Sequence, residues 1–88
     1  MFTLHKNHIQ TDEGFSIEFD RFRFLYQVGG QTYRLNHEML PEHKAIAIWA
    51  GSVRELNPSL AVSIEESEAM VRNIHRALLA VGYRVTIL

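Results

Sequence analysis

Hydrophobic and polar residues alternate along the first third of the chain with the two-residue period of half-buried β-strands. This alternation predicts strands over residues 15–19 and 22–28, and a short edge strand over residues 2–4. The hydrophobic positions change from odd to even numbers across Asp20 and Arg21. A continuous strand would turn one of the two aromatic sets to solvent, so these two residues are expected to form a tight turn or a bulge.

Two adjacent glycines mark the next turn. Gly29 and Gly30 accept the positive φ angles that two-residue hairpin turns require. A turn over residues 28–31 would also place Tyr26 opposite Tyr33, so that apolar side chains meet on one face of the hairpin. The sequence therefore predicts a β-hairpin centred on the two glycines.

The middle of the chain contains one short hydrophobic segment between two polar ones. Residues 36–44 are polar, contain Pro41 and are expected to form a connection. The continuous apolar run at 45–50 is too short for an ordinary core helix and is typical of a central strand buried on both faces. Residues 51–63, which include an Asn-Pro-Ser sequence at 57–59, are expected to form a loop.

One long amphipathic helix is expected over residues 64–81. Ser63 and Glu66 have the spacing of a capping box, in which the serine hydroxyl accepts a backbone N–H and the glutamate reaches back. Gly82 is placed to end the helix in a left-handed conformation, and residues 83–87 alternate as a final strand. The residues expected on or beside the buried stripe of this helix are Ile64, Met70, Val71, Ile74, Ala77, Leu78 and Val81.

These elements predict a single α+β domain over residues 1–88. Its expected architecture is a four- or five-stranded, mostly antiparallel sheet with one long C-terminal helix packed on one face, followed by a final strand. A chain of 88 residues with 47% hydrophobic and 22% charged residues has room for one core and lies in the ordinary globular range. The absence of cysteine excludes disulfides and thiolate chemistry and suits a reducing compartment.

The expected location of the protein and its net charge disfavour some classes of binding partner. The first residues lack the apolar core of a signal peptide, and no stretch approaches the ~18 apolar residues that cross a bilayer, so we expect a cytoplasmic protein without a membrane partner. A net charge of −1 and a pI near 6.5 disfavour direct binding to nucleic acid. The aromatic residues between 15 and 33 resemble an RNA-stacking platform, but their face is the one expected to bury the helix, which favours core packing.

The polar residues of the chain form no recognised motif for catalysis or metal binding. No two histidines have the spacing of a metal-binding helix, and there is no nucleophile elbow or phosphate-binding glycine loop. We therefore expect no enzymatic activity, no bound metal and no cofactor. The histidines, interpreted as scattered surface residues, are His5, His8, His37, His43 and His75.

Acidic residues gather at two places, the first turns of the expected helix and the end of the strand at 15–19. Carboxylates at a helix N-terminus complement the helix dipole, and Glu68 has the i,i+4 spacing to pair with Arg72. These local roles explain most of the cluster and leave open whether a basic partner also uses it. The candidate binding residues are Glu65, Glu66 and Glu68 at the first place, and Glu18 and Asp20 at the second.

Several segments between Ile17 and Val85 together resemble the small α+β immunity proteins of bacterial polymorphic-toxin systems, which include those of contact-dependent growth inhibition. The resembling group has members that end in a Ser-capped helix, a glycine and a strand. The segments are Ile17-Glu18-Phe19 with Asp20-Arg21, Ala45-Ile46-Ala47-Ile48-Trp49, Leu56-Asn57-Pro58, Val62-Ser63-Ile64-Glu65-Glu66, Asn73-Ile74-His75-Arg76-Ala77-Leu78 and Gly82-Tyr83-Arg84-Val85.

The resemblance implies a binding protein without a catalytic site. Such a protein would bind and neutralise a cognate toxin domain, often a nuclease, in the cytosol of the producing cell. The resemblance does not identify the toxin or the face that binds it. The alternative class is a small nucleic-acid-associated regulatory protein or an adaptor subunit, for which salt-dependent binding to generic DNA or RNA would be the distinguishing observation.

Overall fold

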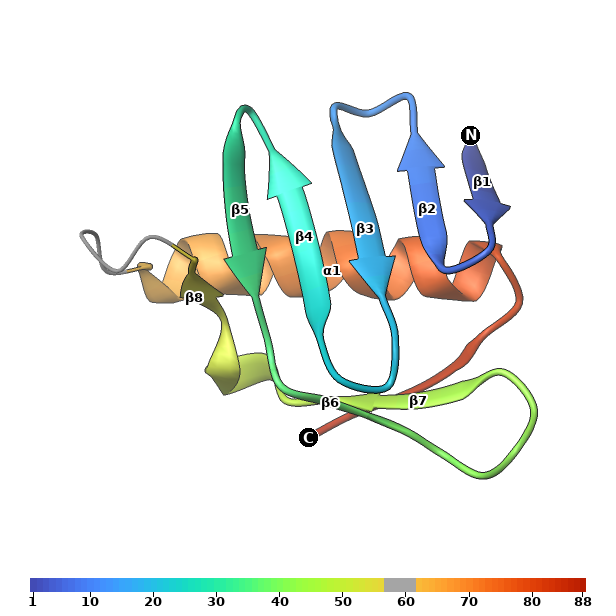
Figure 1. The fold of residues 1–88 in the computed structure, drawn as a ribbon. Helices are drawn as coiled ribbons and strands as arrows, with labels where there is room; N and C mark the ends of the chain where they lie inside the picture. Colours follow the sequence, from blue (N-terminus) through green and yellow to red (C-terminus); the bar gives the residue numbers. More distant parts are fainter. Residues whose placement is uncertain (57–61) are drawn as a thin grey trace.

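The fold was obtained as a computed structural model that describes residues 1–56 and 62–88. Over these residues it is an α+β fold with two sheets and one long helix (Figure 1). A six-stranded antiparallel sheet has the order β1-β2-β3-β4-β5-β8, and a three-stranded sheet has the order β6-β7-β9. The strands are β1 (Phe2–His5), β2 (His8–Thr11), β3 (Phe15–Phe19), β4 (Phe24–Val28), β5 (Gln31–Arg34), β6 (His37–Met39), β7 (Ala45–Ile48), β8 (Arg54–Glu55) and β9 (Arg84–Ile87).

The helix α1 (Ile64–Ala80) lies across one face of the six-stranded sheet, and Figure 1 views the sheet from its other, uncovered face. Alternate strand residues point toward the helix and are buried, as the two-residue period predicts. The fully buried side chains Ile17 and Phe24 from the sheet belong to the same core as Ile74 and Leu78 from the helix. The core therefore fills the space between this sheet and α1.

The smaller sheet borders the core at the end where β3 and β4 connect (Figure 1). Its middle strand β7 is buried at all four positions, and it pairs antiparallel with β6 and parallel with β9. This agrees with the predicted strand buried on both faces, but the strand ends at Ile48, and Trp49, within the predicted run at 45–50, is 36% exposed. The parallel pairing requires a long crossover between β7 and β9, and α1 lies in that connection.

The ends of the helix follow the predicted chemistry. The Ser63 hydroxyl accepts a hydrogen bond from the Glu66 backbone N–H at 3.1 Å, which is one half of the predicted capping box; among the described residues the Glu66 side chain does not bond back to Ser63. At the other end, Gly82 has a φ of 93°, and the Tyr83 N–H donates to the Leu78 carbonyl oxygen at 2.9 Å. This is the left-handed termination that a glycine permits after a helix.

The hairpin between β4 and β5 is also confirmed. Gly29 and Gly30 have φ angles of 55° and 79°, and Tyr26 is paired with Tyr33 across the two strands. The change of parity near Asp20 is explained by a turn over residues 20–23, because Phe19 is paired with Phe24. The turn therefore ends β3 and starts β4 with the aromatic side chains of both strands in the core.

The predicted number of strands and sheets was wrong. In the described residues nine strands form two sheets. β2 follows the predicted edge strand at 2–4, β6 lies within the expected connection at 36–44, and β8 lies within the expected loop at 51–63. A short 3-10 helix, η1 (Ala50–Ser52), joins the predicted run at 45–50 to that loop. β6, β8 and η1 have two or three residues each, too few to show a period. The Asn-Pro-Ser sequence at 57–59 lies outside the described residues.

Two hydrophobic residues expected in the fold's interior are exposed. Phe22 lies in the turn before β4 and is 88% exposed, and Ile64 is the first residue of α1 and is 78% exposed. Ile64 lies at the end of α1 that begins beside β8, whereas Ile74 and Leu78 lie further along the helix and are buried in the core. Among the described residues, no helix is long and apolar enough to cross a membrane.

Candidate protein-binding surfaces

The start of α1 presents an apolar side chain among carboxylates. Ile64 is the first helical residue and projects into solvent, and Glu65, Glu66 and Glu68 are all exposed around the first turns. The Ser63 cap fixes the backbone of this turn. We call Ile64 with these three glutamates the acidic surface.

A fourth carboxylate lies close to this surface and was not anticipated from the sequence. Glu55 on β8 is paired with Tyr33 on β5. Burial raises the pKa of Tyr33, and the charges of Glu55 and Glu66 raise it further. Both carboxylates therefore lie near the same phenol. The pairing of β5 with β8 brings Glu55 to this end of the molecule, and no local motif in the sequence predicts that pairing.

The acidic surface borders a hollow of about 300 Å³ between α1 and the segment around η1. Ile64 and Glu68 line it from the helix, and Ala50 and Val53 line it from the opposite side. The Ser67 hydroxyl donates to the Ala50 carbonyl oxygen at 3.3 Å and joins the two sides. The apolar lining of the hollow suits the aliphatic stem of a partner side chain, and Glu68 and Arg54 place charges of both signs around it. The expected ion pair from Glu68 to Arg72 does not form in the described part of the chain.

Glu18 and Asp20 do not join the acidic surface. Glu18 lies on the uncovered face of the six-stranded sheet, because its neighbours Ile17 and Phe19 point into the core, and it forms a 3.6 Å ion pair with Arg23. The sheet therefore separates Glu18 from the helix that carries the acidic surface.

Asp20 has a structural role in the turn before β4. Its Oδ1 accepts hydrogen bonds from the backbone N–H groups of Phe22 at 2.7 Å and Arg23 at 3.0 Å. These two bonds, the first of them above all, hold the pKa of the Asp20 carboxyl below its usual value. The carboxylate is thus occupied by its own turn.

Histidine placement is more ordered than the sequence indicated. His5 and His8 lie on the paired strands β1 and β2 and stand opposite each other. The Nε2 atom of His37 lies within hydrogen-bonding distance of the Asp20 carbonyl oxygen. Across residues 1–56 and 62–88, no three His, Cys, Asp or Glu side chains are grouped so that they could hold a metal ion.

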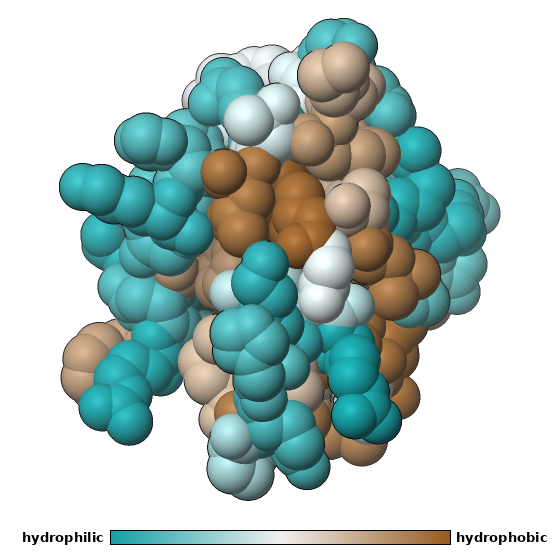
Figure 2. Space-filling view, turned by 90° about the vertical axis from the view of Figure 1, so that its right-hand side faces the viewer, coloured by the Kyte–Doolittle hydropathy of each residue, from teal (hydrophilic) through white to brown (hydrophobic). Residues whose placement is uncertain are grey.

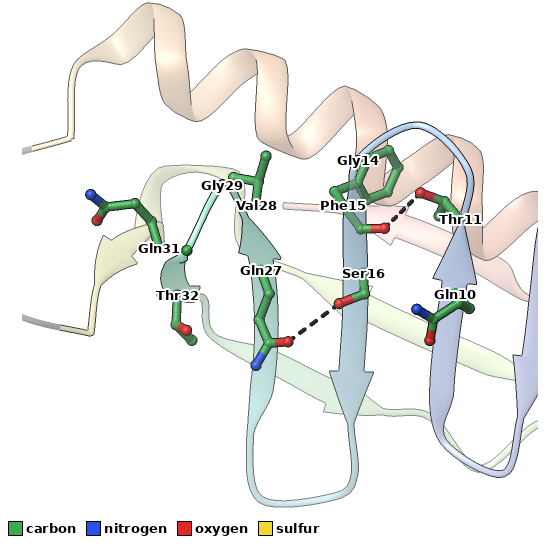
Figure 3. Close-up of a pocket in the computed structure, with 11 residues that line it drawn as sticks. Gln10, Thr11, Gly14, Phe15, Ser16, Gln27, Val28, Gly29, Gln31 and Thr32 are labelled. Carbon is green, nitrogen blue, oxygen red and sulfur yellow. Dashed lines mark hydrogen bonds between the residues drawn. The ribbon is translucent and has the colours of Figure 1, made fainter.

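The uncovered face of the sheet carries a row of uncharged polar side chains. These occupy opposite positions on five neighbouring strands: Thr3, Gln10, Ser16, Gln27 and Thr32. Figure 3 shows Ser16 and Gln27 reaching toward each other, at 3.3 Å, in a hollow of about 410 Å³ at the loop end of β2–β5. No carboxylate, histidine or cation lines this hollow, so it has no general acid or base.

A hydrophobic patch lies at the end of the molecule that carries β1 and the end of α1 (Figure 2). Phe2 and Leu4 of the edge strand β1 are partly buried there, and Leu79 of α1 is 52% exposed. The Arg76 guanidinium lies 5.7 Å from the centre of the Phe2 ring and pairs with Glu13 at 2.7 Å, which borders the patch with charge. This patch and the acidic surface lie at opposite ends of α1.

Comparisons of the chain with protein-family models, curated proteins and solved structures found no match.

Proposed function

We propose that this chain is an immunity protein that binds and neutralises a cognate toxin domain, possibly a nuclease, in the cytosol of the cell that makes the toxin. The observation that carries the proposal is the exposed Ile64 among Glu65, Glu66 and Glu68, held on the capped first turn of a rigid helix. Ile64 adjoins a hollow lined by Ala50, Val53 and Val62, so this surface combines an apolar centre with a charged rim, as many protein contacts do. The proposal also rests on the resemblance to small α+β immunity proteins.

The charge of the acidic surface suits a basic target. A nuclease holds phosphate with lysines and arginines, so a group of carboxylates complements its substrate cleft. Such complementarity mainly raises the association rate and the specificity. Because the chain has a net charge of only −1, this effect would have to come from the local cluster rather than from the whole molecule.

Co-expression tests the proposal directly. The toxin candidate is the C-terminal domain of any large secreted protein encoded immediately upstream, produced in cells with or without this chain. We expect growth only when this chain is present, and purification of a complex between the two proteins. A toxic domain that kills equally in both strains would refute the proposal.

Charge reversal then tests the surface. The Glu65→Lys/Glu68→Lys variant should lose association rate with the toxin, and more at low salt than at high salt. The matched control is Glu38→Lys/Glu42→Lys, which reverses two exposed carboxylates elsewhere on the chain. Protection that both double variants retain in full would move the contact away from the acidic surface while leaving immunity in place. Salt-dependent binding of the chain to generic DNA or RNA would instead favour a regulatory protein.

A further inference from the structure

A groove of about 340 Å³ lies where the turn before β4 meets the end of β5. Two exposed apolar side chains line it: Phe22 is 88% exposed, and Leu56, just after β8, is 54% exposed. Leu25, on the uncovered face of the sheet, contributes a partly buried surface between them. Two large exposed apolar side chains that line one groove, with Leu25 beside them, make it a candidate contact surface.

The structure around the groove holds Phe22 outward. Asp20 accepts the backbone N–H groups of Phe22 and Arg23, and the Asp20 N–H donates to the Arg23 carbonyl oxygen at 3.0 Å. The Asp20 carbonyl oxygen is within hydrogen-bonding distance of the His37 ring, which ties the turn to β6. Exposure of Phe22 is therefore a property of a fixed turn.

Two arginines give the groove its charge. Arg23 and Arg34 both line it, and no carboxylate does. Arg23 has only the 3.6 Å pair with the exposed Glu18, and Arg34 forms no ion pair with any of the described residues. A matching ligand would present an apolar side chain beside carboxylates.

The acidic surface of the same chain has this chemistry, with an exposed isoleucine among three glutamates. We propose that the chain self-associates, with the groove of one copy receiving Ile64 and Glu65 of a second copy. The glutamates would pair with Arg23 and Arg34, while Ile64 contacts Phe22 and Leu56. A net charge of −1 produces little overall repulsion between copies.

The expected complex is a weak two-fold dimer. Because β8 and the start of α1 lie at the same end of the molecule (Figure 1), one two-fold axis would let both contacts form at once. The surface area buried by one Ile64 side chain in one groove is far below the ~1,000 Å² of a stable interface. Two such contacts bring the buried area closer to that value. The proposal is independent of toxin binding, since it concerns the chain alone, but a toxin on the acidic surface would compete with the second copy.

Sedimentation of the 88-residue chain at low salt tests the proposal. The wild type should shift with concentration from 10.2 kDa toward twice that mass, and added salt should reverse the shift. Arg34→Glu and Glu65→Lys should each raise the dissociation constant by about tenfold or more. The combined variant Arg34→Glu/Glu65→Lys exchanges the charges and should recover most of the lost affinity. Phe22→Ala should weaken association at every salt concentration.

A control substitution and a test of folding accompany these variants. Arg84→Glu makes the same charge change at an exposed position on β9 and should associate like the wild type. Circular dichroism should show that every variant is folded, as expected from exposed side chains. A wild type that stays at 10.2 kDa at ~1 mM and low salt would overturn the proposal. So would a folded charge-exchange variant that fails to recover, or an Arg34-dependent binding of single-stranded oligonucleotide by a strictly monomeric protein.

Discussion

Truncation of Leu78 offers a direct test of how the helix is held on the sheet. Leu78 is fully buried in the core, and Leu79, the next residue on the same helix, is 52% exposed. Leu78→Ala removes three buried carbon groups, each worth about 0.8 kcal/mol of transfer free energy, so about 2.4 kcal/mol is lost before any cavity is counted. The cavity that remains should bring the loss to about 3–4 kcal/mol.

This loss is large for so small a protein. At about 0.05–0.15 kcal/mol per residue, a chain of this length has an unfolding free energy of about 4–13 kcal/mol. Urea unfolding followed by circular dichroism and by the fluorescence of Trp49 would measure the change. Leu79→Ala is the matched control, because it has the same effect on helix propensity but should cost under about 1 kcal/mol. A difference between the two variants below about 1 kcal/mol would refute the placement of Leu78 in the core.

Three further predictions concern the turns and the histidines. In urea titrations, Gly29→Ala should lower the unfolding free energy by about 1–2 kcal/mol, because Gly29 has a left-handed φ. The control is Gly51→Ala, where φ is ordinary and an added Cβ likewise meets no atom within 4 Å. This variant should be neutral or slightly stabilising. Folding lowers the Asp20 pKa, so the contribution of this carboxylate to the stability of the fold is present above about pH 4 and is lost as the pH falls through the folded pKa. The melting temperature of Asp20→Asn should therefore lie below that of the wild type at pH 7. This difference in melting temperature should close below about pH 4. Zinc at modest excess should leave the melting temperature of the wild type unchanged, and a rise abolished by substituting His5 or His8 would contradict this.

The helix and the central hairpin could be predicted because their signals are local. The Ser63 cap, the stripe through Ile74 and Leu78, and Gly82 specify the helix within one stretch of sequence. Gly29 and Gly30 specify the hairpin in the same way, since only two residues separate its strands. Each of these features is decided by residues fewer than about twenty positions apart.

The division into two sheets could not be predicted, because it depends on contacts between distant segments. β8 has two residues and exists only through its pairing with β5, and β7 finds its parallel partner β9 across the whole of α1. No period or turn motif encodes either pairing. The exposure of Ile64 follows from the same global arrangement, since this residue lies at the end of α1 that begins beside β8.

For the acidic residues too, the sequence predicted only the grouping that local structure decides. Glu65, Glu66 and Glu68 were identified from the sequence as a group, and the helix keeps them together because they lie within two turns. Glu18 was grouped with Asp20 on proximity in sequence, yet one is paired with Arg23 on the sheet face and the other caps a turn. Residues two apart share a face only within a strand, and β3 ends at Phe19, so Asp20 belongs to the turn rather than to the face that carries Glu18.

A net charge near zero does not imply an electrostatically neutral surface. The arginines of the groove, Arg23 and Arg34, and the glutamates of the acidic surface nearly cancel in the total, yet they lie on different elements of the fold. Steering and specificity depend on the local potential within about 10 Å at ordinary ionic strength. Arg34→Glu therefore separates the two proposals, because it alters the groove and leaves the acidic surface intact. Toxin neutralisation should survive that substitution, and self-association should not.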